Sequence, residues 1–295
     1  VGAGGEFDNS LISRHTASII GIDPLNEECE ACHFDSGTTH PTSAMSLRDP
    51  DAAAVWSGDT DVYCVKCHDG TAPTTPVDFS YINSDAKYNK ASFIGTPHDN
   101  SLNSCLECHK RHGSPYTALT KQATNYENCF ACHDGLTANT TISSADIAIP
   151  GTSGTGLAFS TDTNPVSASS GLYQTNTPTD ATMLARLDSG NIVCSTCHDP
   201  HNGNPKYTVI DNTSDAMCKD CHSARDVGTY LPDLTNKGSH PVGVAYVSSA
   251  GYVDPAPTLS STSVGLVSGN VECSSCHGVH NTTSTDGNLL RMTND

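Results

Sequence analysis

The segment Cys105-Leu-Glu-Cys-His-Lys-Arg-His112 decides how this chain folds, and Cys194-Ser-Thr-Cys-His-Asp-Pro-His201 repeats its pattern. Both begin with Cys-x-x-Cys-His. This five-residue motif occurs seven times and uses all 14 cysteines of the 295-residue chain. The cysteines are Cys29, Cys32, Cys64, Cys67, Cys105, Cys108, Cys129, Cys132, Cys194, Cys197, Cys218, Cys221, Cys273 and Cys276. The histidines that close the motifs are His33, His68, His109, His133, His198, His222 and His277.

Cys-x-x-Cys-His is the attachment motif of c-type haem. The two thiols form thioether bonds with the porphyrin, and the following histidine binds the iron as its proximal ligand. A lone Cys-x-x-Cys can also be half a zinc site or a redox dithiol, and many cysteines can form a disulfide scaffold. None of these requires a histidine after every second cysteine. The sequence therefore predicts seven covalently bound haem c groups, which we number by motif in chain order.

The composition predicts a chain that is mostly coil, with short helices and few strands. Aromatic residues make up 6 %, whereas there are 24 glycines and 16 prolines, which favour turns. Little apolar surface is therefore available for a side-chain core, and we expect the haems to form it in an elongated molecule. Helical turns are predicted around Asp215–His222 and Tyr126–His133. The runs Tyr207–Ile210 and Val242–Val247 favour short strands.

The motif spacing predicts a single heptahaem unit, residues 1–295, built from internal repeats. The repeats lie around 98–133, 164–222 and 240–280. A segment without a haem motif, about 137–184, is rich in Ser, Thr, Gly and Asn, and we expect an inserted loop or a small β-rich insertion there.

The net charge of −18 makes nucleic acid and anionic membranes unsuitable partners. No apolar run is long enough to span a bilayer, so membrane insertion is not expected. Covalent haem attachment takes place outside the cytoplasmic membrane, and the N-terminus resembles a processed one. We therefore expect a secreted, extracellular protein, with the periplasm as the alternative location.

Seven further histidines match the seven haems one to one, which predicts a second histidine ligand for every iron. They are His15, His40, His98, His112, His201, His240 and His280. The simplest assignment gives each to the next motif along the chain. It pairs His15 with haem 1, His40 with haem 2, His98 with haem 3, His112 with haem 4, His201 with haem 6 and His240 with haem 7.

Haem 5 and His280 fall outside this local assignment. Asn164-Pro-Val aligns with His240-Pro-Val, so asparagine stands where the repeat places a distal ligand for haem 5. His280 follows the last motif and has no haem after it. Three arrangements give each of the seven irons two histidine ligands. His280 can bind haem 5 of a neighbouring subunit, or haem 1 of the next subunit while His15 binds haem 5 across the interface, or haem 5 of its own chain.

The motif array with its His-Pro-Val and Cys-Ser-x-Cys-His-x-x-His segments resembles multihaem c-type cytochromes of metal-reducing microbes. It is most similar to the extracellular cytochrome filaments, or cytochrome nanowires. The resemblance implies low-spin haems stacked in a continuous chain, subunits joined head to tail, and a histidine of one subunit bound to a haem of the next. It also implies other redox proteins or extracellular acceptors as partners.

Two histidines on every iron leave no site for a substrate, so we expect electron transfer and no catalysis. Three functions remain open on the sequence. The first is a polymeric electron conduit, and the second is a soluble periplasmic electron shuttle. The third is a multihaem reductase whose open iron would be haem 5, next to Asn164.

Overall fold

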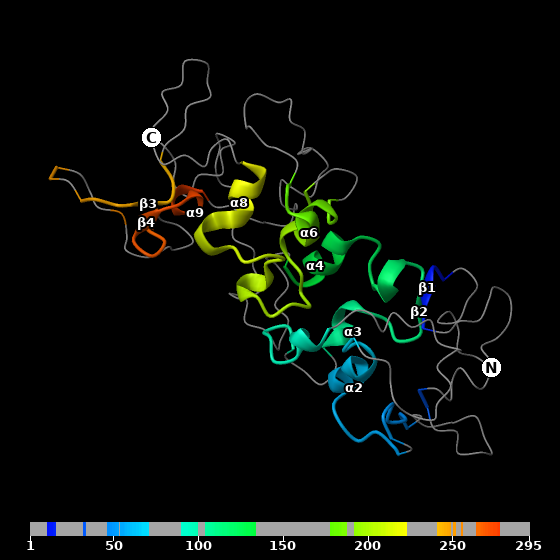
Figure 1. Ribbon diagram of the computed structural model, residues 1–295. Coiled ribbons are helices and arrows are strands. Elements are labelled where there is room, and N and C mark those ends of the chain that lie inside the picture. Colours follow the sequence, from blue (N-terminus) through cyan, green and yellow to red (C-terminus); the bar gives the residue numbers. More distant parts are fainter. Residues whose placement is uncertain are drawn as a thin grey trace, which may run out of the picture. The chain divides into compact units, whose positions relative to one another are not determined.

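Regular structure in this computed structural model is confined to short elements spread along the chain (Figure 1). The structure describes residues 11–15, 32–33, 46–52, 54–70, 90–99, 104–133, 178–187, 192–222, 241–248, 250–251, 255 and 264–277. Most of these residues form turns, bends and coil, which confirms the predicted fold class. The predicted insertion lies outside the described residues except for 178–184.

Short helices carry six of the seven haem-attachment motifs, which are motifs 2 to 7. They are α2 (Thr60–Cys67), α3 (Cys105–Cys108), α4 (Asn125–His133), α7 (Cys194–Cys197), α8 (Ala216–Cys221) and α9 (Cys273–Cys276). In five motifs the backbone N–H of the histidine donates to the carbonyl of the first cysteine, for example from His109 to Cys105 at 3.0 Å. This single helical turn fixes the two thiols and the imidazole together. The helices predicted around Tyr126–His133 and Asp215–His222 are confirmed by α4 and α8.

The strands form two antiparallel pairs, each two residues long (Figure 1). They are β1 (Ser13–Arg14) with β2 (Gly113–Ser114), and β3 (Val244–Ala245) with β4 (Asn270–Val271). The run Val242–Val247 contains β3, as predicted. The run Tyr207–Ile210 is not a strand. It begins at the end of a 3₁₀ turn, and Thr208 makes an isolated bridge with His198.

In the described parts of the chain, the remaining elements are one further helix and four 3₁₀ turns. They are α6 (Ala181–Leu184), η2 (Ala91–Phe93), η3 (Thr117–Leu119), η4 (Pro205–Tyr207) and η5 (Thr213–Asp215). The chain divides into two compact units. One holds residues 1–128 and 200–203, and the other holds 129–199 and 204–295. Motifs 1–3 belong to the first unit and motifs 4–7 to the second. That both form one heptahaem body stays a prediction.

The described residues bury little apolar side-chain surface. In the second unit a small cluster joins Met183, Met217 and Cys221. Several of the most deeply buried side chains are polar instead, including Asp61, Ser114, Thr196 and Glu272. Such clusters would be a weak basis for ordering so long a chain, in line with the expectation that haem supplies the core.

Motifs 3 and 5 continue into the same loop, which is a structural repeat. After motif 3, the N–H of Lys110 donates to the Leu119 carbonyl at 2.7 Å, and Lys121 N–H donates to Cys108 at 2.9 Å. After motif 5, Asp199 N–H donates to Tyr207 at 2.7 Å and Val209 N–H donates to Cys197 at 3.0 Å. The loop therefore folds back onto its own motif in both copies.

A buried carboxylate three residues before one motif caps the helix of the next motif. Asp61, which precedes motif 2, is fully buried and accepts from the backbone N–H of Ser104 at 2.6 Å and of Cys105 at 2.8 Å. Asp215, which precedes motif 6, accepts from the N–H of Ser274 at 2.6 Å. Because the first N–H groups of a helix have no partner within it, these carboxylates fix motif 3 on motif 2 and motif 7 on motif 6.

Candidate functional site: paired histidines and paired cysteines

Three motif histidines of the first unit each face a second histidine. The ring centres are 6.3 Å apart for His33 and His112, 6.3 Å for His15 and His68, and 5.9 Å for His109 and His201. In each pair one ring comes from a haem-attachment motif and the other is one of the seven further histidines.

The spacing in these pairs fits an iron between two imidazoles. With metal–nitrogen bonds of about 2 Å on both sides, the two ring centres would be about 6 Å apart. The ring planes are inclined by 34 to 51°, so the rings do not stack on each other. Among the described residues no three His, Cys, Asp or Glu side chains converge on one metal position. Each pair offers two imidazoles, and a porphyrin would supply four further nitrogens to an iron held between them.

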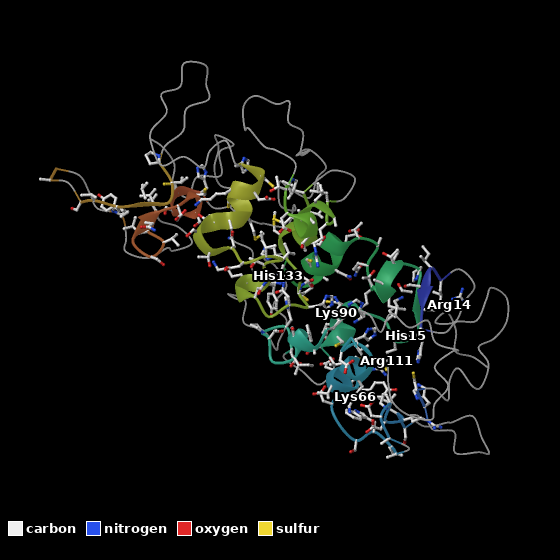
Figure 2. All side chains as sticks on the ribbon, viewed as in Figure 1. Arg14, His15, Lys66, Lys90, Arg111 and His133 are labelled. Carbon is white, nitrogen blue, oxygen red and sulfur yellow. The ribbon has the colours of Figure 1, made fainter. Side chains whose placement is uncertain are left out.

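Backbone carbonyls hold three of the imidazoles through Nδ1. Nδ1 of His109 lies 2.9 Å from the Ala118 carbonyl, Nδ1 of His198 2.9 Å from that of Lys206, and Nδ1 of His15 2.5 Å from that of Arg111. Figure 2 shows His15 beside Arg111. Because a carbonyl only accepts, Nδ1 must carry the proton and Nε2 presents its lone pair. This arrangement orients a histidine as a metal ligand and raises its basicity.

The two carbonyls that hold motif histidines belong to residues with a left-handed backbone. Ala118 has φ 53° and Lys206 has φ 57°, and each is followed by a second such residue, Leu119 or Tyr207. This conformation is costly for residues other than glycine, so it persists only where the surroundings enforce it. In both copies it turns a carbonyl towards the imidazole, which identifies the loop as a support for the motif histidine.

Burial keeps these imidazoles neutral at pH 7. It lowers the pKa of His109 to about 4, and it also lowers the pKa values of His15, His33 and His198. A neutral imidazole is the form that binds a metal, because a protonated ring has no lone pair to donate.

The β1–β2 pair brings two distal histidines together. The strands pair Arg14 with Gly113, and the N–H of His15 donates to the carbonyl of His112 at 3.2 Å. The two histidines are thus neighbours across the strands, yet His15 faces His68 of motif 2 and His112 faces His33 of motif 1. One short strand pair therefore positions two histidines opposite the histidines of two different motifs.

The first cysteines of consecutive motifs also lie in pairs. The thiols of Cys64 and Cys105 are hydrogen-bonded, and this bond lowers the pKa of Cys64. Cys129 likewise bonds to Cys194 and lowers its pKa to about 7. The third pair is Cys218 with Cys273, where the bond lowers the pKa of Cys273 and raises that of Cys218. Motifs 2 and 3, 4 and 5, and 6 and 7 therefore meet at their first cysteines.

The histidine pairs differ from the local assignment of distal ligands. His15 faces motif 2 and not motif 1, His112 faces His33 of motif 1, and His201 faces His109 of motif 3. The difference has a physical cause, because strand pairing and loop packing bring together histidines that are far apart in the sequence.

One of the proposed arrangements across subunits also differs from these pairs. It required His280 on haem 1 and His15 on haem 5, but His112 faces motif 1 and His15 faces motif 2. Cys29, His40, His240 and His280 lie outside the described residues.

Several residues that hold the histidines in place could not be identified from the sequence. Phe93 is buried, and its ring centre lies 6.3 Å from that of His201. The guanidinium of Arg186 donates to the carbonyls of Ser195 at 3.2 Å and His198 at 3.5 Å, and it pairs with Asp199 at 2.5 Å. The spacing His-x-x-His in the sequence indicates that the second histidine could be a ligand. It does not indicate which iron that histidine would bind.

Residues 98–138 and 187–227 match the family described as the doubled CXXCH motif. The doubled motif indicates a haem-binding, multihaem c-type cytochrome. The two matched segments contain motifs 3 and 4 and motifs 5 and 6, and they include the two copies of the folded-back loop. Neither the curated proteins nor the solved structures gave a match to this chain. Among the described residues, no helix has the length and apolar character needed to cross a membrane.

Replacing Arg186 with Gln is expected to lower the reduction potential of one haem, by on the order of tens of millivolts. The cation next to His198 favours the reduced iron, and its loss also leaves the Asp199 carboxylate uncompensated. A potentiometric titration followed by absorbance measures the shift. Arg186→Lys keeps the charge and should retain most of the potential. Equal midpoint potentials in wild type and Arg186→Gln would contradict this role.

Proposed function

We propose that the chain transfers electrons through seven covalently attached haems, each with two histidine ligands. The observation that carries the proposal is the set of three histidine pairs, spaced at 5.9 to 6.3 Å. Haem supplies a reversible one-electron couple at iron. The chain's own residues hold the imidazole rings through backbone carbonyls, and two histidines would ligate each iron. An iron held in this way has no position for a substrate, so the proposed role is that of a carrier and not of an enzyme.

We propose that a polymer is the working form, in which at least one of the remaining histidines is given to a neighbouring chain. His112, His15 and His201 account for haems 1, 2 and 3, which leaves His40, His98, His240 and His280 for haems 4 to 7. His40 and His98 have no iron left among haems 1 to 3 and must ligate a later haem, in their own chain or in a neighbouring one. A ligand given to a neighbour is a heterologous contact that does not close on itself and so builds a filament.

We place this polymer outside the cell, where its charge of −18 keeps it soluble and directs it towards cationic or mineral acceptors. Its partners would be further copies of itself, other redox proteins and extracellular acceptors. A periplasmic shuttle uses the same haems without the polymer. The polymeric conduit and the periplasmic shuttle should therefore have the same haem spectra, and the assembly state of the protein distinguishes them.

The haem content is tested by mass. Matured protein should exceed the 30.8 kDa polypeptide by seven haem masses, and it should contain seven irons and no zinc. Its electron paramagnetic resonance spectrum should show low-spin iron only. Replacing both cysteines of motif 4, Cys129 and Cys132, with Ser should remove one haem mass. Fewer haems in fully matured wild type, or a high-spin iron that binds carbon monoxide, would contradict the proposal and favour the reductase.

Assembly is tested by negative-stain electron microscopy of the secreted protein over a range of concentrations. Filaments of constant width support the polymer. Particles the size of one chain at every concentration would overturn the polymer and support the shuttle, while the haem content would remain as proposed.

A further inference from the structure

Two of the histidine pairs share a sequence relation that the third does not. His112 stands three residues after the histidine of motif 3 and faces His33 of motif 1. His201 stands three residues after the histidine of motif 5 and faces His109 of motif 3. In both cases the last residue of Cys-x-x-Cys-His-x-x-His reaches the haem two motifs earlier in the chain.

The residues that hold His112 differ from those that hold His201, although each histidine faces the motif two positions earlier. His112 is held by its carbonyl, which accepts from the N–H of His15 next to the β1–β2 pair. His201 lies against the buried ring of Phe93 in η2, and the nearby Gly203 faces the backbone of Ser92. In both cases the histidine faces the motif two positions earlier in the chain, although its surroundings differ. We therefore attribute this pairing to the Cys-x-x-Cys-His-x-x-His segment itself. In both copies the second histidine lies within the folded-back loop that follows its own motif.

We propose that the second histidine of every Cys-x-x-Cys-His-x-x-His segment ligates the haem two motifs upstream in the same chain. His112 then serves haem 1, His201 serves haem 3 and His280 serves haem 5. His280 lies outside the described residues, and its assignment follows from the relation that the other two establish. The proposal rests on the proposed function, because it takes each iron to have two histidine ligands.

The proposed ligation two motifs upstream accounts for both features that the local assignment left unexplained. Haem 5 has Asn164 where the repeat places a ligand, and His280 has no haem after it. A step of two motifs upstream from motif 7 ends at motif 5, so the missing ligand and the surplus histidine become partners. The odd-numbered haems 1, 3 and 5 are then linked to motifs 3, 5 and 7 by the same device.

The test uses His112→Ala in full-length protein from which one haem has been deleted. Without haem 4 (Cys129→Ser, Cys132→Ser), His112→Ala should still produce one high-spin iron that binds carbon monoxide. Without haem 1 (Cys29→Ser, Cys32→Ser), the same change should produce no additional high-spin iron. The opposite pattern would restore the local assignment to haem 4 and overturn the proposal. Lys110→Ala, two residues before His112, is the matched control and should leave all irons low-spin.

If a deletion background does not fold, a density map of the intact holoprotein decides. The expected map places Nε2 of His112 on the iron attached at His33, and Nε2 of His201 on the iron attached at His109. Any other iron for either histidine overturns the relation. Failure of the proposed function is distinguishable, because the wild type would then already contain high-spin iron before any ligand is removed.

Discussion

One high-spin iron per chain, able to bind carbon monoxide, is the expected result of replacing His280 with Ala. The new open iron should be haem 5, for which no other histidine is proposed. In a background without haem 5 (Cys194→Ser, Cys197→Ser) the same change should add no high-spin signal. Absorbance and electron paramagnetic resonance measure the fraction of high-spin iron. Asn281→Ala alters the neighbouring residue and should leave the spectrum unchanged.

Dilution of the wild type separates a ligand within the chain from one between chains. If His280 binds haem 5 of its own chain, all irons stay low-spin at concentrations where only single chains remain. If it binds a neighbour's haem 5, one high-spin iron per chain appears as the polymer dissociates. The second outcome would contradict the ligation within one chain while leaving the polymer intact.

Replacing Asp61 with Ala is expected to lower the free energy of unfolding by about 2–4 kcal/mol, because two backbone N–H groups lose their acceptor. Asp61 is fully buried, so water cannot take its place at Ser104 and Cys105 without opening the structure. Denaturant unfolding followed by absorbance measures the loss. Asp61→Asn keeps one acceptor oxygen and should retain part of the stability.

The ion pair between Asp51 and Lys66 provides the matched control. Its side chains are 35 % and 33 % exposed, so Asp51→Ala should cost less than about 1 kcal/mol. A loss at Asp61 no larger than that at Asp51 would show that the cap does not stabilise motif 3. Asp215→Ala should behave as Asp61→Ala does, with its effect at motif 7.

The attachment sites could be read from the sequence because thioether chemistry requires a fixed local pattern. Cys105 to His109 form one helical turn, and any chain that carries this pattern presents the two thiols and the imidazole together. The predominance of coil also followed from composition. Both predictions depend on short-range geometry, which the sequence specifies directly.

The partner of each distal histidine could not be read in this way. His15 reaches motif 2 because β1 pairs with a strand about 100 residues later, and nothing near His15 in the sequence indicates that strand. The contacts of the Ala118 and Lys206 carbonyls with motif histidines could not be predicted either. Every residue has a backbone carbonyl, and the sequence does not show which one will contact an imidazole. Buried supports such as Phe93 look like any other aromatic residue until the fold places them.

The paired first cysteines have a consequence for biosynthesis. Cys64 with Cys105, Cys129 with Cys194, and Cys218 with Cys273 lie within hydrogen-bond distance of each other, and the contact with Cys129 lowers the pKa of Cys194 to about 7. Thiols this close form disulfides readily in an oxidising compartment. A chain that folds before it is loaded would therefore cross-link one motif to the next and lose both attachment sites. Maturation must keep these thiols reduced, or deliver haem while the polypeptide is still extended.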